Sequence, residues 1–182
     1  MVIIQMTGLS GAGKSTLAHC LKEALSELKI AIEVIDADVY RQSVCRDLGF
    51  SAADRRENIR RLARIADQHR RAGTLAVIAA INPYADVRKE ISQQFGAKTV
   101  WVKCGLPTLI QRDTKGLYRK ALLPDNHPQK IRNLSGINDP YEATEQADLI
   151  IDTEKASINS STKRLLDFVL AELKPANPFQ NA

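Results

Sequence analysis

The chain has 182 residues, of which 44% are hydrophobic and 26% charged, and it carries a formal net charge of +5. This length fits one domain with a full hydrophobic core, and no apolar run approaches the roughly 20 residues of a membrane-spanning helix. The N-terminus lacks a signal-peptide pattern and the three cysteines form no Cys-x-x-Cys pair, so we expect a cytoplasmic protein without a disulfide framework, a zinc site or a membrane partner.

Strands and helices are predicted to alternate along the chain, which indicates a parallel sheet with helices on both faces. The apolar runs that predict strands are residues 2–6, 32–35, 75–81, 99–103 and 149–151. Helical periodicity is found at residues 14–28, 39–48, 54–72, 86–95 and 157–173, with a further helix start at Pro107. The sequence therefore predicts an α/β fold of three layers around a five-stranded parallel sheet.

Seven arginines gather in the long predicted helix, between residues 55 and 71. Apolar residues recur among them at helical spacing, so we expect most of these arginines on a solvated helix face. Aromatic residues make up only 5% of the chain and are not interleaved with the arginines. The segment therefore offers no stacking platform for single strands, and we predict no nucleic-acid partner.

Residues 115–142 fit no regular element and contain three prolines. A loop of this length in a compact domain is usually functional or disordered, and in a phosphotransferase it would be a lid. We predict a single domain over residues 1–174, with the lid at 115–142. The remaining residues, 175–182, are predicted to be a flexible tail.

A complete phosphate-binding motif follows the first predicted strand. Residues 8–15 read Gly-Leu-Ser-Gly-Ala-Gly-Lys-Ser, which matches G-x-x-x-x-G-K-[ST] between a strand and a helix. The glycines let backbone N–H groups face phosphate oxygens, Lys14 can reach the β- and γ-phosphates, and Ser15 can bind Mg²⁺. The predicted nucleotide-binding residues are Gly8, Ser10, Gly11, Ala12, Gly13, Lys14, Ser15 and Thr16.

Two carboxylates, Asp36 and Asp38, follow the second predicted strand. Alternate residues reach the same side of a site, at the sheet edge where ligands bind. One carboxylate can orient Mg²⁺ and the other can accept a hydroxyl proton; the alternative is an Asx turn with a helix cap at Asp38.

The motifs of other nucleotide-hydrolysing classes are missing. No Asn-Lys-x-Asp guanine motif of GTPases is present, nor a strand that ends in the Asp-Glu pair of motor ATPases. The sequence therefore predicts a kinase that uses ATP and Mg²⁺.

Six segments of the chain together resemble the adenylyl-sulfate kinase (APS kinase) family. They are residues 8–16, 36–41, 46–51, 54–61, 112–118 and 135–142. The resemblance extends from Gly8 to about Leu173 and implies a P-loop NTPase fold. It also implies transfer of the ATP γ-phosphoryl to the 3′-hydroxyl of adenosine 5′-phosphosulfate (APS), giving PAPS and ADP in sulfate assimilation. The implied partners are the small molecules ATP and APS, and we expect a homodimer.

The resemblance also implies roles for single residues. Asp38 matches the catalytic carboxylate and acts with Lys14, while Ser15 and Asp36 would hold the metal. Phe50 would stack on the adenine of APS, and the planar fork of arginine suits the phosphosulfate oxygens. The other residues expected at the acceptor are Arg41, Arg55, Asn58, Ile81, Asn82, Lys115 and Leu134, and Arg112 would lie near the ATP.

Three positions depart from the family pattern. Ala37 replaces a glycine, Asn82 replaces a serine, and Leu134 replaces an aromatic residue that would stack on adenine. Because a stacked base contributes about 1–3 kcal/mol, Leu134 predicts weakened APS binding. One alternative is therefore a divergent paralogue with another nucleotide-linked or anionic acceptor, and a second is a nucleotide-binding regulatory module with little turnover.

Overall fold

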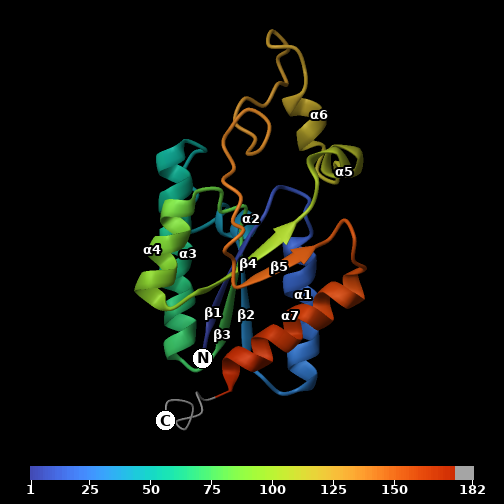
Figure 1. Cartoon of the computed structure of the whole chain (residues 1–182). Helices are drawn as coiled ribbons and strands as arrows, with labels where there is room; N and C mark the ends of the chain where they lie inside the picture. Colours follow the sequence, from blue (N-terminus) through green and yellow to red (C-terminus); the bar gives the residue numbers. More distant parts are fainter. Residues whose placement is uncertain (175–182) are drawn as a thin grey trace.

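The computed structural model describes residues 1–174; the tail predicted at 175–182 lies outside the described residues. Five parallel strands form one sheet in the order β2-β3-β1-β4-β5 (Figure 1). The strands are β1 (Ile3–Thr7), β2 (Ile32–Asp36), β3 (Leu75–Ala79), β4 (Lys98–Lys103) and β5 (Leu149–Asp152). The helices are α1 (Lys14–Glu27), α2 (Ala37–Tyr40), α3 (Ala52–Arg71), α4 (Ala85–Phe95), α5 (Leu106–Arg112), α6 (Leu117–Ala121) and α7 (Ile158–Leu173).

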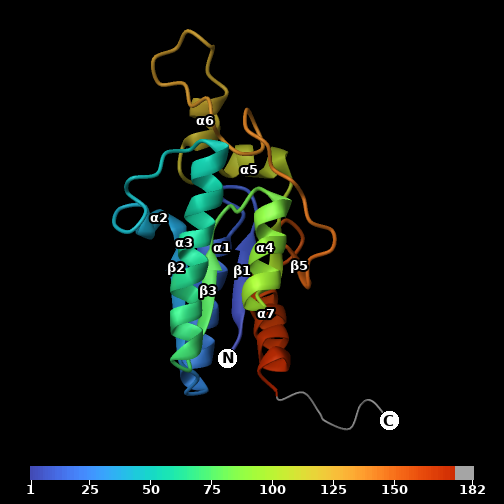
Figure 2. The same ribbon diagram turned by 90° about the vertical axis from the view of Figure 1, so that its left-hand side faces the viewer.

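Helices cover both faces of the sheet, as predicted. Helices α3 and α4 pack on one face and α1 and α7 on the other (Figures 1 and 2). Every residue of β1 and β3 is buried, because these central strands face a helical layer on each side. Two hydrophobic clusters result, one under each pair of helices. The predicted α/β class and three-layer architecture are therefore confirmed.

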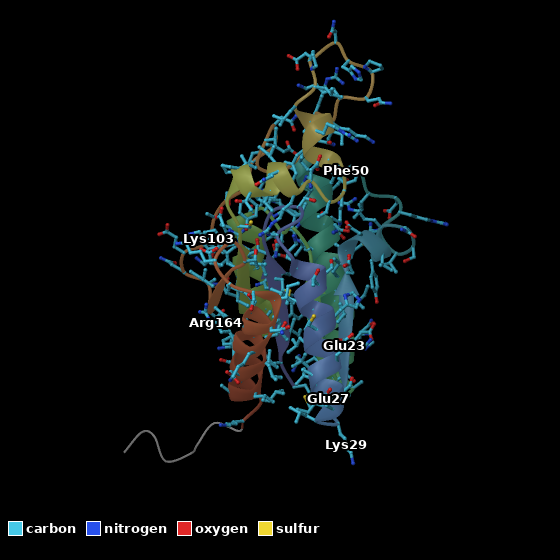
Figure 3. The ribbon with its side chains drawn as sticks, turned by 90° about the vertical axis from the view of Figure 1, so that its right-hand side faces the viewer. Glu23, Glu27, Lys29, Phe50, Lys103 and Arg164 are labelled. Carbon is cyan, nitrogen blue, oxygen red and sulfur yellow. The ribbon has the colours of Figure 1, made fainter. Side chains whose placement is uncertain are left out.

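Many charged side chains lie on the outer faces of the helices, far from the edge to which the strands point. Glu23 and Glu27 on α1 and Arg164 on α7 point outward, far from Phe50 at the other end of the molecule (Figure 3). The arginines of α3 mostly form ion pairs: Arg60 with Glu90, Arg61 with Asp47 and Arg64 with Glu57. Among residues 1–174, no helix is long and apolar enough to cross a membrane.

The element boundaries differ from the predicted ones at three places. The helix predicted at 39–48 is only α2, and turns follow it. Of residues 41–50 only Cys45 is buried, so this stretch has no apolar stripe to hold a helix on the sheet. Strand β3 ends at Ala79 and not at residue 81, because the chain turns at Asn82 with φ 45°. The lid contains a helix, α6, that the sequence did not predict.

The strands all point toward one edge, where the phosphate-binding loop, α2 and the lid meet. The lid rises above this edge, and the N-terminus lies at the opposite end (Figure 1). The lid is attached near its start to the loop, because the buried Tyr118 of α6 donates a hydrogen bond to the Ser10 carbonyl at 2.8 Å. This edge therefore brings together most of the predicted site residues.

Candidate active site

The loop between β1 and α1 has a backbone that requires glycine. Gly8 has φ 154°, and a Cβ there would lie 2.3 Å from the carbonyl oxygen of Val102. Gly13, directly before α1, has φ 98°, in the left-handed region that other residues rarely adopt. The loop thus presents its N–H groups and the positive end of α1 to one space, as an anion site requires.

Lys14 is buried at the start of α1 and has no carboxylate partner among residues 1–174. Its Nζ donates hydrogen bonds to the carbonyls of Gly8 and Leu9, both at 2.8 Å. Burial, and next the nearby charge of Lys115, lower the pKa of Lys14 to about 8. The lysine is held within its own loop, in a place where a bound phosphate would supply the missing negative charge.

Asp36 connects the phosphate-binding loop with α2. Its Oδ2 accepts a hydrogen bond from the Ser15 hydroxyl at 2.5 Å, and its Oδ1 accepts one from the Asp38 N–H at 2.9 Å. The helix cap that the sequence offered as an alternative at Asp38 is therefore formed by Asp36. Asp38 is free of that role and is well exposed, with its carboxylate paired to the Lys115 ammonium.

The pair of Ser15 and Asp36 fits a magnesium ion that a nucleotide would bring. Among residues 1–174, no group of three or more His, Cys, Asp or Glu residues could hold a metal alone. Mg²⁺ at nucleotide sites takes only one or two protein ligands and completes its octahedron with phosphate oxygens and waters. One hydroxyl and one carboxylate beside the phosphate-binding loop match that donor set.

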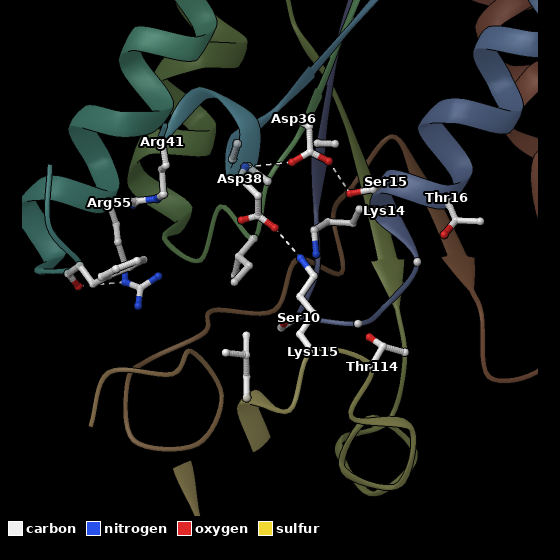
Figure 4. A pocket seen from close by; sticks show the side chains of 18 of the residues that line it. Ser10, Lys14, Ser15, Thr16, Asp36, Asp38, Arg41, Arg55, Thr114 and Lys115 are labelled. Atoms are coloured by element: carbon white, nitrogen blue, oxygen red, sulfur yellow. Dashed lines mark hydrogen bonds and ion pairs between the residues drawn. The ribbon is translucent and has the colours of Figure 1, made fainter. Parts of the chain in front are cut away.

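A cavity of about 570 Å³ opens between the loop, α2 and the lid (Figure 4). This volume lies within the roughly 300–1,000 Å³ of small-molecule sites. The predicted residues that line the cavity are Ser10, Gly11, Gly13, Lys14, Ser15, Thr16, Asp36, Asp38, Arg41, Phe50, Arg55, Ile81 and Lys115. Ala37 also lines it; as the first residue of α2 it accepts a methyl group without strain.

One end of the cavity combines an aromatic ring with two guanidinium groups. Those of Arg41 and Arg55 lie 4.4 and 5.4 Å from the centroid of the Phe50 ring, which is half exposed. Burial, followed by the neighbouring charge of Arg55, lowers the pKa of Arg41. Arg55 also forms an ion pair of 3.3 Å with Asp139. This end of the cavity can bind a planar ring and an anionic group together.

The family is identified by its sequence model. The model of adenylylsulphate kinase matches residues 1–152. The chain belongs to this family. An adenylyl-sulfate kinase of Synechococcus sp. (strain JA-3-3Ab) is 40% identical over 95% of this chain and 94% of its own length. A probable bifunctional SAT/APS kinase of Sorangium cellulosum is 42% identical over 90% of this chain, which spans only 28% of that larger protein.

Among solved structures, the Mycobacterium tuberculosis APS kinase in complex with AMPPNP and APS is similar to this chain. The TM-score is 0.85 and the identity 33%, over 93% of this chain and 97% of that one. The predicted family is therefore confirmed, and the chain is a nucleotide-binding kinase of the adenylylsulphate kinase family.

Four residues that the family resemblance placed at ligands do not line the cavity. Asn58 is buried on α3, and Leu134 is buried in the hydrophobic cluster under α1 and α7. The Asn82 amide points into the interior and donates to the Gln5 Oε1 at 3.1 Å. Arg112 lies beside the loop, where it donates to the Thr153 carbonyl at 3.3 Å.

Several residues that line the cavity were not predicted. Thr114 and Leu117 flank Lys115 and belong to a segment that resembled the family, so the motif itself could have indicated them. Ile131 and Asn133 come from irregular lid backbone, and no periodicity or motif in the sequence marks them. Apart from Lys115, the lid wall of the cavity is thus the part that sequence reasoning missed.

Proposed function

We propose that the chain is an adenylyl-sulfate kinase that transfers the γ-phosphoryl group of ATP to the 3′-hydroxyl of APS, forming PAPS and ADP in sulfate assimilation. One observation carries the proposal: a phosphate-binding loop and an arginine–phenylalanine end share a single cavity, in a chain 40% identical over 95% of its length to an adenylyl-sulfate kinase. Figure 4 shows Lys14 and Ser15 on one side of Asp38, and Arg41 and Arg55 on the other.

On the ATP side, the loop N–H groups and Lys14 would bind the β- and γ-phosphates. The Lys14 ammonium would exchange its two carbonyl partners, Gly8 and Leu9, for phosphate oxygens, which match its charge better. Ser15 and Asp36 would hold Mg²⁺, which would neutralise negative charge on the phosphates. Arg112, behind the loop next to Thr153, would lie near the nucleotide without lining the cavity.

On the acceptor side, Phe50 would stack on the adenine of APS, while Arg41 and Arg55 would bind the phosphosulfate. Guanidinium groups already lie over the exposed Phe50 ring, so ring and anion sites are adjacent. Two cations this close repel each other, and after burial the neighbouring charge of Arg55 is the next cause of the lowered pKa of Arg41. An anionic acceptor would relieve that repulsion, which favours APS over an uncharged alcohol.

Asp38 would accept the proton of the acceptor hydroxyl. It lines the cavity between the phosphate-binding loop and the two arginines (Figure 4), and its carboxylate is paired with Lys115 of the lid. Phosphoryl transfer through a loose transition state does not require a strong base, so a carboxylate is sufficient. The Lys115 ammonium, once released from Asp38, would stand next to the transferred group and stabilise its charge.

We further propose that the protein works as a homodimer in the cytoplasm. Oligomers occur among relatives: a hexameric APS kinase of Thiobacillus denitrificans, 27% identical, contains a region like this chain in 29% of its length. Light scattering on the purified protein tests the proposal, and a monomer mass at assay concentrations would refute the dimer.

The experiment that tests the function is a coupled ADP-release assay with Mg-ATP and APS, in which the product is identified by mass. We expect turnover at low micromolar APS and a product with the mass of PAPS. If ATP binds but APS does not accelerate ADP release, the acceptor is wrong and the paralogue interpretation takes its place. A screen of other nucleotide-linked anions would follow.

A further inference from the structure

Arg88 of α4 is a buried cation outside the cavity. Its side chain is 4% exposed, and its two terminal nitrogens donate to the carbonyl oxygens of Asn82, at 2.8 Å, and Glu142, at 2.7 Å. Among residues 1–174 no carboxylate forms an ion pair with it. A buried charge that binds only backbone carbonyls is costly, and hydrophobic packing alone would be served better by an apolar side chain. Arg88 joins two backbone segments that no strand or helix joins.

The first segment is the turn after β3. Asn82 is 2% exposed and has φ 45°, in the left-handed region where a non-glycine residue is strained. Its carbonyl also accepts a hydrogen bond from the Thr7 hydroxyl at 3.0 Å, and its Oδ1 has no partner in the described part of the chain. The turn follows Ile81, which lines the cavity. Hydrogen bonds from Arg88 and Thr7 therefore stabilise a turn whose backbone conformation Asn82 does not itself favour.

The second segment is the end of the lid. The Glu142 N–H donates to the Pro83 carbonyl at 2.9 Å, and the Glu142 carboxylate accepts from the Ala85 N–H at 2.6 Å. Next to it, the Tyr141 hydroxyl lies 3.0 Å from the Thr7 hydroxyl. The lid therefore returns to the sheet edge at the same turn that Arg88 holds.

This attachment lies close in sequence to the acceptor side of the cavity. Asp139, three residues before Glu142, forms the ion pair with Arg55, and Arg55 also contacts the Asn133 carbonyl. A shift of the lid end would therefore move the lid residues around Arg55. The start of the lid has its own attachment through Tyr118 and Ser10. The phosphate-binding loop meets the turn at its first residue, where the Gly8 N–H donates to the Ile81 carbonyl at 3.2 Å, so loss of Arg88 should disturb this loop less than the lid end.

We propose that Arg88 is a positioning residue of the kinase, which clamps the end of the lid to the turn after β3 and thereby sets the acceptor wall of the cavity. This inference rests on the proposed function. Ordering the lid before the acceptor arrives lowers the entropy lost on binding. Loss of the clamp should therefore raise the KM for APS and leave ATP binding nearly unchanged.

The test compares Arg88→Met, which keeps the aliphatic stem, with Arg88→Lys, which keeps the charge but lacks the planar fork of two terminal nitrogens. Arg64→Met on the outer face of α3 is the matched control. For Arg88→Met we expect the KM for APS to rise about tenfold, as the loss of charged hydrogen bonds predicts. Arg88→Lys should recover part of this loss. The KM for ATP should change less than about twofold, and Arg64→Met should behave as wild type.

Hydrogen exchange gives a readout that does not depend on the acceptor. We expect faster exchange at residues 133–142 in Arg88→Met, with a smaller change in the peptide that contains residues 8–15. If Arg88→Met fails to fold, Tyr141→Phe removes the hydroxyl that lies against Thr7 and should give a smaller change of the same kind. Equal increases of KM for ATP and APS, or unaltered exchange at residues 133–142, would overturn the clamp. If APS does not accelerate ADP release by the wild-type protein, the proposed function is refuted, but hydrogen exchange still tests the clamp.

Discussion

The two walls of the cavity differ in the kind of chain that forms them. The phosphate wall, residues 8–16 with Asp36, comes from the ends of β1 and β2 and the start of α1, and its contacts are mainly to backbone. The lid wall, which includes Lys115, Ile131 and Asn133, comes from irregular chain and is closed by the ion pairs Lys115–Asp38 and Arg55–Asp139. The wall proposed to bind ATP is therefore preformed by the fold, whereas the wall proposed to bind the acceptor depends on contacts that a ligand can replace.

The largest expected effect lies in the phosphate wall. Lys14→Ala should lower kcat by about 10³-fold, because it removes a buried cation aimed at the transferred phosphates. The ADP-release assay measures it, with Lys22→Ala on the outer part of α1 as the control. The protein should fold normally, since the lost hydrogen bonds only hold the lysine within its loop. Turnover near that of wild type would mean that this wall does not bind the ATP phosphates.

Asp38 lies between the two walls, and its substitution should have the second-largest effect on turnover. Asp38→Asn should lower kcat by about 10²-fold or more, because the amide cannot accept the hydroxyl proton. ATP affinity, measured by titration calorimetry, should change little, because the side chain contacts the lid lysine and not the loop. Asp167→Asn on α7 is the control. If kcat stays near the wild-type value, Asp38 is not the base.

Phe50 tests the acceptor side alone. Phe50→Ala should raise the KM for APS by about tenfold, which corresponds to one lost base–aromatic stack. The KM for ATP should remain that of wild type, because Phe50 lies at the arginine end of the cavity. An equal rise for both substrates would show that the two walls are not independent.

The two walls differ in how well the sequence predicts them. The family, the sheet and the phosphate wall were predictable, because a contiguous motif between a strand and a helix determines the backbone that binds phosphate. The acceptor-wall residues Arg41, directly after α2, and Arg55, on α3, were predicted from the resemblance alone. Ile131 and Asn133 could not be predicted, because irregular chain carries no periodicity. The role of Arg88 could not be predicted either, because it depends on two carbonyls that are distant from each other in the sequence.

The smallest expected effect concerns Leu134. The sequence alone predicts that Leu134→Phe tightens APS binding, but the side chain is 5% exposed and packs in the hydrophobic cluster. A larger ring should overpack this site and lower stability by about 1–3 kcal/mol. Thermal unfolding and the KM for APS distinguish overpacking from tighter APS binding. A lower KM with unchanged stability would show that Leu134 turns toward the acceptor when the lid closes.

The buried Lys14 also links nucleotide binding to the uptake of protons. Its pKa of about 8 lies below the ordinary 10.5, so the unfolded chain binds more protons above pH 8 than the folded protein. Stability should therefore rise as the pH increases from 8 toward 10.5. Bound phosphates restore the charged lysine, so ATP binding at pH 8.5 should draw protons from the buffer. The heat of binding should then differ between buffers of high and low ionisation enthalpy, and this difference should vanish in Lys14→Met.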